Sequence, residues 1–300
     1  MVYLLAVAAA LARAVGGVLQ RIGVESAPAE DAMHLRLLTN ALRRGVWLAG
    51  FAFLLLTFAL QATALRFGDL TVVQPILTTE LLFLIGILAV VFHHPLGWRD
   101  WVGVAAIVTG LGAFLALSAP AVGHGIPATR AWGTVSVVVL IALVGLVLAA
   151  RSGPRWWRAA AFGAAAAMLF AYTSSFTKAT TTLITGGWGH VFTHWEPYAL
   201  GLTGLLGFFM LQNALHAGPI AASRSVMVIV NPLVSIAIGV LVFDEHLRTG
   251  AGFVAGEVLA LAVMCAGAVT LSQSPLVTGD SADGGPGEML GRKAAAPAPG

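Results

Sequence analysis

The chain has 300 residues, of which 58% are hydrophobic and only 10% are charged. Soluble domains carry roughly 25% charged residues, and a mean hydropathy of +0.90 means more apolar surface than a soluble fold can bury. The composition therefore excludes a soluble globular protein and predicts an integral membrane protein. The formal charge of +3 comes from basic residues scattered between apolar runs, so we expect no nucleic-acid partner.

Apolar runs long enough to cross about 30 Å of hydrocarbon occur nine times along the chain. In chain order they cover Val2–Leu19, Val46–Leu65, Leu70–Val91, Trp101–Ala119, Trp132–Ala150, Ala159–Leu183, Tyr198–Ala217, Ile220–Phe243 and Gly250–Leu271. These runs must be helices, because open strands in lipid would leave backbone groups unpaired. All eight tryptophans fall at or near the proposed ends, as expected of an aromatic belt at the lipid–water boundary.

The distribution of basic residues predicts the orientation in the cell membrane. With nine spans, ten basic residues fall on one face: Arg21, Arg36, Arg43, Arg44, Arg99, Arg151, Arg155, Arg158, Arg292 and Lys293. The other face receives four: Arg66, Arg130, Lys178 and Arg248. Positive residues favour the cytoplasm, so we expect the N-terminus outside and the C-terminus inside. Residues 274–300 are rich in Gly, Pro, Ala and Ser, which predicts a disordered cytoplasmic tail.

An internal repeat divides the chain. The segment FALQATALRFGDL (Phe58–Leu70) is similar to FMLQNALHAGPI (Phe209–Ile220), and a polar–proline pair follows each of them, Gln74-Pro75 and Asn231-Pro232. We predict a four-helix repeat in residues 1–119, a connecting transmembrane helix in 120–150 and a second four-helix repeat in 151–273. Because one span connects the two units, they enter the membrane in opposite senses, which is the inverted-topology arrangement of many secondary transporters.

The same segments carry a family resemblance. From Val2 to Gln273 the chain resembles the drug/metabolite transporter superfamily (EamA-like), in which two related helical repeats form the protein. Within it, GDLTVVQP (Gly68–Pro75) is most similar to the branch of NIPA-type magnesium transporters and their bacterial relatives. Members commonly have ten helices with both ends cytoplasmic, whereas nine runs are visible here, so one helix near the N-terminus lacks a counterpart. The resemblance implies membrane transport of a small solute or of magnesium.

Two acids and three bases lie within the apolar runs: Glu80, Glu257, Arg13, Lys178 and Arg224. A charge at the bilayer centre costs about 2.5–3.5 kcal/mol and usually marks a pathway or a site. Glu80 lies mid-span and is interpreted either as a proton-titrating or cation-contacting carboxylate or as part of a structural ion pair. Arg13 and Arg224 lie too deep to reach the surface, so we expect Glu80 to pair with one of them. Lys178, by contrast, is expected to extend toward the outer surface.

Two further acids fall on the predicted outer side. Asp69 is expected at the outer mouth, and Glu245 is expected to pair with Arg248 or to face water.

Uncharged polar groups complete the set of candidates. Gln74 and Asn231 stand beside prolines, and each proline frees a backbone carbonyl that persists in a membrane only where it lines a cavity or is capped. Other polar residues on the helices are either substrate contacts or ordinary interhelical hydrogen bonds; the candidates among them are Gln61, Gln212 and Tyr172. Gly252 and Gly256 have the spacing of a close helix contact, which leaves either internal packing or a homodimer open.

We interpret the chain as a secondary transporter of a small metabolite or drug-like solute, working by alternating access with proton coupling or exchange through Glu80. The alternatives are a magnesium or other divalent cation transporter and a non-transporting membrane partner subunit. Two embedded acids against three bases favour an anionic or zwitterionic solute over a dication. No Walker motif, no metal-ligand set and no nucleophile–base pair is found, so we expect no enzyme activity, metal or cofactor.

Overall fold

The computed structural model describes residues 1–25, 45–92, 96–118, 129–184, 187–248 and 250–278. Within these ranges every regular secondary-structure element is an α-helix, and nine spans are long and apolar enough to cross a membrane. The chain is therefore a multi-pass membrane protein, and the nine predicted spans are confirmed over the described residues.

The helices of the first half are α1 (Val2–Glu25), α3 (Gly45–Phe67), α4 (Leu70–Leu77), α5 (Glu80–Phe92), α6 (Trp98–Ser118) and α7 (Thr129–Ala149). Those of the second half are α8 (Arg155–Leu183), α9 (Trp188–Phe192), α10 (Glu196–Ala217), α11 (Ile220–Phe243), α12 (Ala251–Ser272) and α13 (Pro275–Thr278). The predicted tail begins one residue before α13, so its first residues are helical rather than disordered. Its remainder, 279–300, lies outside the described residues.

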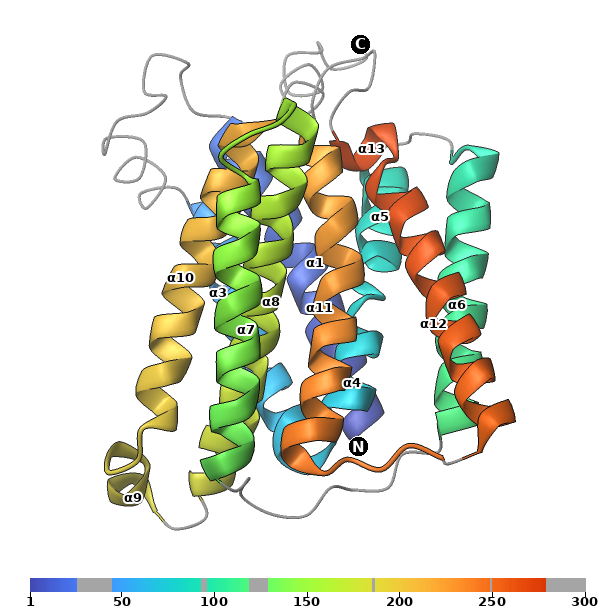
Figure 1. Ribbon diagram of the computed structural model, residues 1–300. Helices are drawn as coiled ribbons and strands as arrows, with labels where there is room; N and C mark the ends of the chain where they lie inside the picture. The colour runs from blue at the N-terminus through green and yellow to red at the C-terminus, as the bar shows by residue number, and fades with distance from the viewer. Residues whose placement is uncertain (26–44, 93–95, 119–128, 185–186, 249, 279–300) are drawn as a thin grey trace, which may run out of the picture.

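The spanning helices stand side by side and alternate in direction (Figure 1). We call the end of the bundle where α1 begins the N-terminal face, and the end where α12 finishes the C-terminal face. Spans α1, α4–α5, α7, α10 and α12 run from the N-terminal to the C-terminal face, and α3, α6, α8 and α11 run back. Each end of a spanning segment can thus be assigned to one of the two faces.

The third span is broken near its middle, shortly after the Gln74-Pro75 pair. Helix α4 ends at Leu77, and α5 begins at Glu80. Between them the Thr78 N–H donates to Pro75 O at 3.1 Å and the Thr79 N–H to Ile76 O at 2.9 Å, three residues back instead of four. Pro75 has no N–H, so the regular ladder is already interrupted there. The break therefore lies directly before the mid-span acid Glu80, the first residue of α5.

Several helix pairs cross with their backbones in close contact. A Cβ atom built on Gly110 of α6 would lie 2.7 Å from Ala260 O of α12. In the pair α1–α3, a Cβ on Gly50 would lie 3.0 Å from Gly16 O. Gly163 of α8 similarly faces the backbone of α11. Only glycine permits such approaches, and small residues at helix contacts are the usual means of packing in lipid.

Candidate functional site

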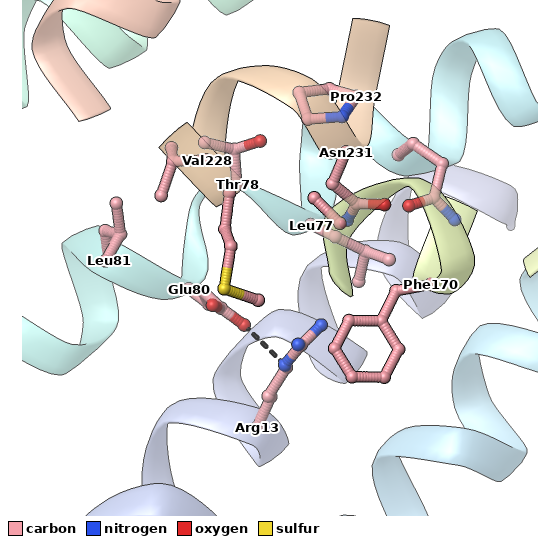
Figure 2. Close-up of a pocket in the computed structure, with 12 residues that line it drawn as sticks. Arg13, Leu77, Thr78, Glu80, Leu81, Phe170, Val228, Asn231 and Pro232 are labelled. Atoms are coloured by element: carbon pink, nitrogen blue, oxygen red, sulfur yellow. Dashed lines mark ion pairs between the residues drawn. The ribbon is translucent and has the colours of Figure 1, made fainter. Parts of the chain in front are cut away.

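A cavity of about 90 Å³ lies between α1, the α4–α5 break, α8 and α11 (Figure 2). Four of the predicted candidates contribute to its wall: Arg13, Gln74, Glu80 and Asn231. The remainder is largely apolar and includes Leu77, Leu81 and Phe170. The cavity thus gathers the mid-span acid, one deep base and both amides that stand next to prolines, although α1, the α4–α5 span and α11 are far apart in the sequence.

The charged part of the cavity is an ion pair between two helices. Arg13 Nε of α1 lies 2.8 Å from Glu80 Oε2, which belongs to the first turn of α5. This contact confirms that an embedded arginine pairs with Glu80. The side chains remain 43% and 30% exposed, and Glu80 Oε2 accepts no well-aligned hydrogen bond from any described residue. The pair is therefore held by charge attraction at the edge of an open space.

The amide groups of the cavity are incompletely bonded. Gln74 is only 2% exposed, yet its Nε2 makes no hydrogen bond within the described part of the chain. Asn231 Oδ1 also lacks a donor there. A buried polar atom left without a partner costs about 1–3 kcal/mol. Such atoms mark positions where a ligand or water completes the bonding.

A second group of charges lies at the N-terminal face; we call it the buried cluster and define it as Asp69, Lys178 and Glu245. Lys178 Nζ donates to Asp69 Oδ1 at 3.0 Å and to Glu245 Oε1 at 2.7 Å. The three residues are only 3%, 9% and 2% exposed, in chain order. The cluster joins the start of α4, the last turns of α8 and the segment that follows α11.

The buried cluster also caps a helix. Glu245 Oε1 accepts the Leu70 N–H at 2.8 Å, and its Oε2 accepts the Thr71 N–H at 2.9 Å. A carboxylate at a helix N-terminus satisfies N–H groups that have no partner within the helix. Since α4 has eight residues rising about 1.5 Å each, the cluster lies about 12 Å along the axis from the α4–α5 break.

Two expectations for these residues are wrong. Lys178 does not extend to the outer surface, because its ammonium is bonded to Asp69 and Glu245. Glu245 does not pair with Arg248, whose guanidinium lies 5.0 Å from the centre of the Phe253 ring. The sequence did contain a signal for the buried cluster. With nine spans counted, Asp69, Glu245 and Lys178 all fall near span ends on the same face.

The structure places the other candidates outside the cavity wall. The Tyr172 hydroxyl is 2.7 Å from Ser136 Oγ, which joins α8 to α7. Gln61 Nε2 donates to Ser174 Oγ at 3.1 Å, which joins α3 to α8. Both candidates thus make interhelical hydrogen bonds.

The remaining three candidates lie on other surfaces of the bundle. Gln212 is exposed on α10, and Arg224 is exposed near the start of α11. Glu257 on α12 is 4% exposed, and its Oε1 has no hydrogen-bond partner among the described residues. Of the neighbouring glycines, Gly256 faces Leu117 of α6, whereas a Cβ on Gly252 would meet no atom within 4 Å.

Within the described ranges, no three His, Cys, Asp or Glu side chains come together in a way that could hold a metal ion. The single carboxylate of the cavity wall is that of Glu80, and it is paired with an arginine.

No protein-family model and no solved structure matches the chain. A curated protein of Corynebacterium glutamicum, named as an uncharacterized protein, is 29% identical over 272 residues. The match covers 90% of this chain and 94% of the relative. The similarity therefore extends over nearly the full length of both proteins and is not confined to one group of helices.

Proposed function

We propose that the chain is a secondary transporter that carries a small solute across the cell membrane by alternating access. The observation that carries this proposal is the Arg13–Glu80 pair in the wall of a cavity at a helix break. Charges are expensive inside a membrane and are found mainly on pathways and sites. Discontinuous helices near the midplane are also a recurrent feature of transporter binding sites.

The arrangement of the helices supports two inverted repeats, in residues 1–119 and 151–273, joined by the connecting helix in 120–150. Spans α1, α3, α4–α5 and α6 run in directions opposite to those of α8, α10, α11 and α12, taken in the same order. Helix α1 packs on α3 as α8 packs on α10, while α4 meets α11 and α6 meets α12. These are the contacts expected of two units related by a pseudo-two-fold axis in the membrane plane.

We assign the N-terminal face to the outside of the cell, as the distribution of basic residues predicts. The buried cluster then closes the outer side of the cavity, because it ties α4 of the first repeat to α8 and α11 of the second. Opening toward the outside requires Lys178 to separate from Asp69 and Glu245. On this proposal the structure represents a state that is closed to the outside.

The test is solute release from vesicles that contain the purified protein and are loaded with a metabolite extract. We expect the wild-type protein to release particular solutes that protein-free vesicles retain, and Glu80→Gln to abolish that release or its pH dependence. Glu257→Gln is the matched control, since it neutralises an embedded acid outside the cavity wall. If wild-type vesicles release no more than protein-free vesicles, the chain is not a transporter, and the partner-subunit alternative takes its place.

The magnesium alternative is tested with the same vesicles, loaded with a magnesium-sensitive dye. Hard cations prefer several oxygen ligands, whereas the carboxylate in this cavity is already neutralised by Arg13. We therefore expect no uptake at millimolar magnesium, and uptake above that of protein-free vesicles would favour the cation transporter instead.

A further inference from the structure

The guanidinium of Arg13 is only partly used. It approaches Glu80 through Nε, and its terminal Nη atoms make no hydrogen bond within the described part of the chain. Figure 2 shows Arg13 directed toward the space between Glu80, Asn231 and Phe170. The planar edge of a guanidinium matches a carboxylate or a similar oxyanion in a bidentate contact. Gln74 also lines the cavity, and its buried Nε2 has no acceptor among the described residues.

The two members of the ion pair differ in what they do when a charged solute arrives. A cation bound to Glu80 would leave Arg13 as an unpaired charge inside the membrane, and a guanidinium does not lose its proton in proteins. An anion bound to Arg13 instead brings a second negative charge beside Glu80, and two carboxylates that share one site do not both stay ionised. Glu80 can restore neutrality by taking up a proton. This asymmetry favours an anionic solute.

We infer that the cavity binds a small organic monoanion on the free edge of Arg13, and that Glu80 takes up one proton as the anion binds. This inference rests on the proposed transport function and names its substrate class and its coupling. The solute is small, because a cavity of about 90 Å³ is well below the roughly 300–1,000 Å³ of drug-sized sites. Its apolar wall, including Leu81 and Phe170, suits a short organic chain or ring.

The charges balance in both states. In the empty site Arg13 carries one positive charge and Glu80 one negative charge. In the loaded site Arg13 is balanced by the solute, and Glu80 is neutral because a proton from the adjoining water has joined its carboxylate. On the opposite side the solute leaves, Glu80 returns its proton to water, and the pair re-forms. One monoanion and one proton therefore cross together, and no net charge moves.

Other charged groups near α5 do not replace Arg13 as the partner of Glu80. Helix α5 packs against α1, α12 and α13, and the cavity is completed by α4, α8 and α11. Among the described residues, only Arg13 is within ion-pair distance of Glu80. Glu257 of α12 and Arg224 of α11 lie outside the cavity wall. Lys178 of α8 is bonded to Asp69 and Glu245, and α13 has no charged residue.

Isothermal titration calorimetry of the purified full-length protein tests this inference. The probes are the monoanions lactate, pyruvate and glycolate, with zwitterionic glycine and cationic methylammonium for comparison. Repeating each titration in buffers of different ionisation enthalpy gives the number of protons taken up. We expect at least one monoanion to bind with uptake of about one proton, and its affinity to rise up to tenfold for each unit by which pH falls. Glycine and methylammonium should not bind.

Two variants distinguish proton uptake from anion binding. Glu80→Gln should bind the same monoanion without proton uptake and independently of pH, whereas Arg13→Gln should lose binding at least tenfold. Arg224→Gln and Glu257→Gln, which remove charges outside the cavity wall, should behave as wild type. The inference is overturned if no monoanion binds, if binding takes up no proton, or if Glu80→Gln leaves the proton count unchanged.

The outcomes also distinguish this inference from the transport proposal. If vesicles release a cation or a zwitterion without a proton, transport stands and the monoanion inference fails. If a monoanion binds with one proton but vesicles never move it, the site stands and transport fails.

Discussion

The buried cluster and the Arg13–Glu80 pair are both groups of opposite charges inside the bundle, but their surroundings differ. In the buried cluster, Lys178 contacts two carboxylates, and Glu245 also accepts two backbone N–H groups. In the cavity, Arg13 contacts Glu80 once and keeps free donors, and both side chains are partly exposed. Ion pairs whose hydrogen bonds are complete hold structure together, whereas those with unused donors and acceptors remain available to a ligand. From this comparison we expect a structural role for the buried cluster and a binding role for the Arg13–Glu80 pair.

The largest effect is expected from breaking the buried cluster. Lys178→Met leaves Asp69 and Glu245 as two buried carboxylates without a cation. Removing one partner of a buried ion pair costs about 3–5 kcal/mol, so we expect a clear fall in the temperature at which the detergent-purified protein unfolds. Arg248→Met is the control, because it removes one positive charge from the same face at an exposed position. Equal unfolding temperatures for the two variants would contradict a structural role for the buried cluster.

A smaller loss of stability is expected in the cavity. Arg13→Gln removes an ion pair whose side chains are partly exposed, and exposed pairs contribute about 0–1 kcal/mol. The free energy of unfolding should therefore change by less than about 1 kcal/mol, although solute binding is lost. Chemical denaturation in detergent measures the first effect, and calorimetry the second. A loss of stability comparable to that of Lys178→Met would make the cavity pair structural as well.

The smallest effect on stability is expected at the amides. Asn231→Leu removes an oxygen that has no donor among the described residues, so the unfolding temperature should stay the same or rise slightly. Solute release from vesicles should nevertheless fall about tenfold, because one polar contact of about 1.4 kcal/mol is lost. Gln212→Leu, on the exposed face of α10, should change neither quantity. Unchanged release with Asn231→Leu would remove Asn231 from the proposed site.

The sequence predicted the spans well, because crossing a membrane requires only length and apolar composition. It could not show which of the two proline-containing spans is broken. Pro75 and Pro232 give the same local signal, yet α11 continues through Pro232 while α4 ends just after Pro75. One difference lies at the start of α4, where Glu245, distant in the sequence, holds the first N–H groups. Such a contact depends on the tertiary structure and leaves no local pattern.

The sequence indicated some residues of the candidate site but not which face of each helix points inward. Helices that are apolar on every side give no periodic pattern to show which face points inward. Charge and proline neighbours were therefore the only signals, and four of the residues that they indicate, Arg13, Glu80, Gln74 and Asn231, line one cavity. Gln61 and Gln212 occupy matching positions of the repeated motif, but one is hydrogen-bonded to α8 and the other is exposed.

The close helix–helix contacts at glycines limit how the bundle can change shape. Where Gly110 meets α12, or Gly50 meets α1, no layer of side chains separates the two backbones, so there is nothing to repack if the helices tilt against each other. We therefore expect each such pair to move as a single rigid body. On the transport proposal, solvent would reach the cavity from a new direction when whole pairs, such as α6–α12 at the margin of the bundle in Figure 1, slide past their neighbours.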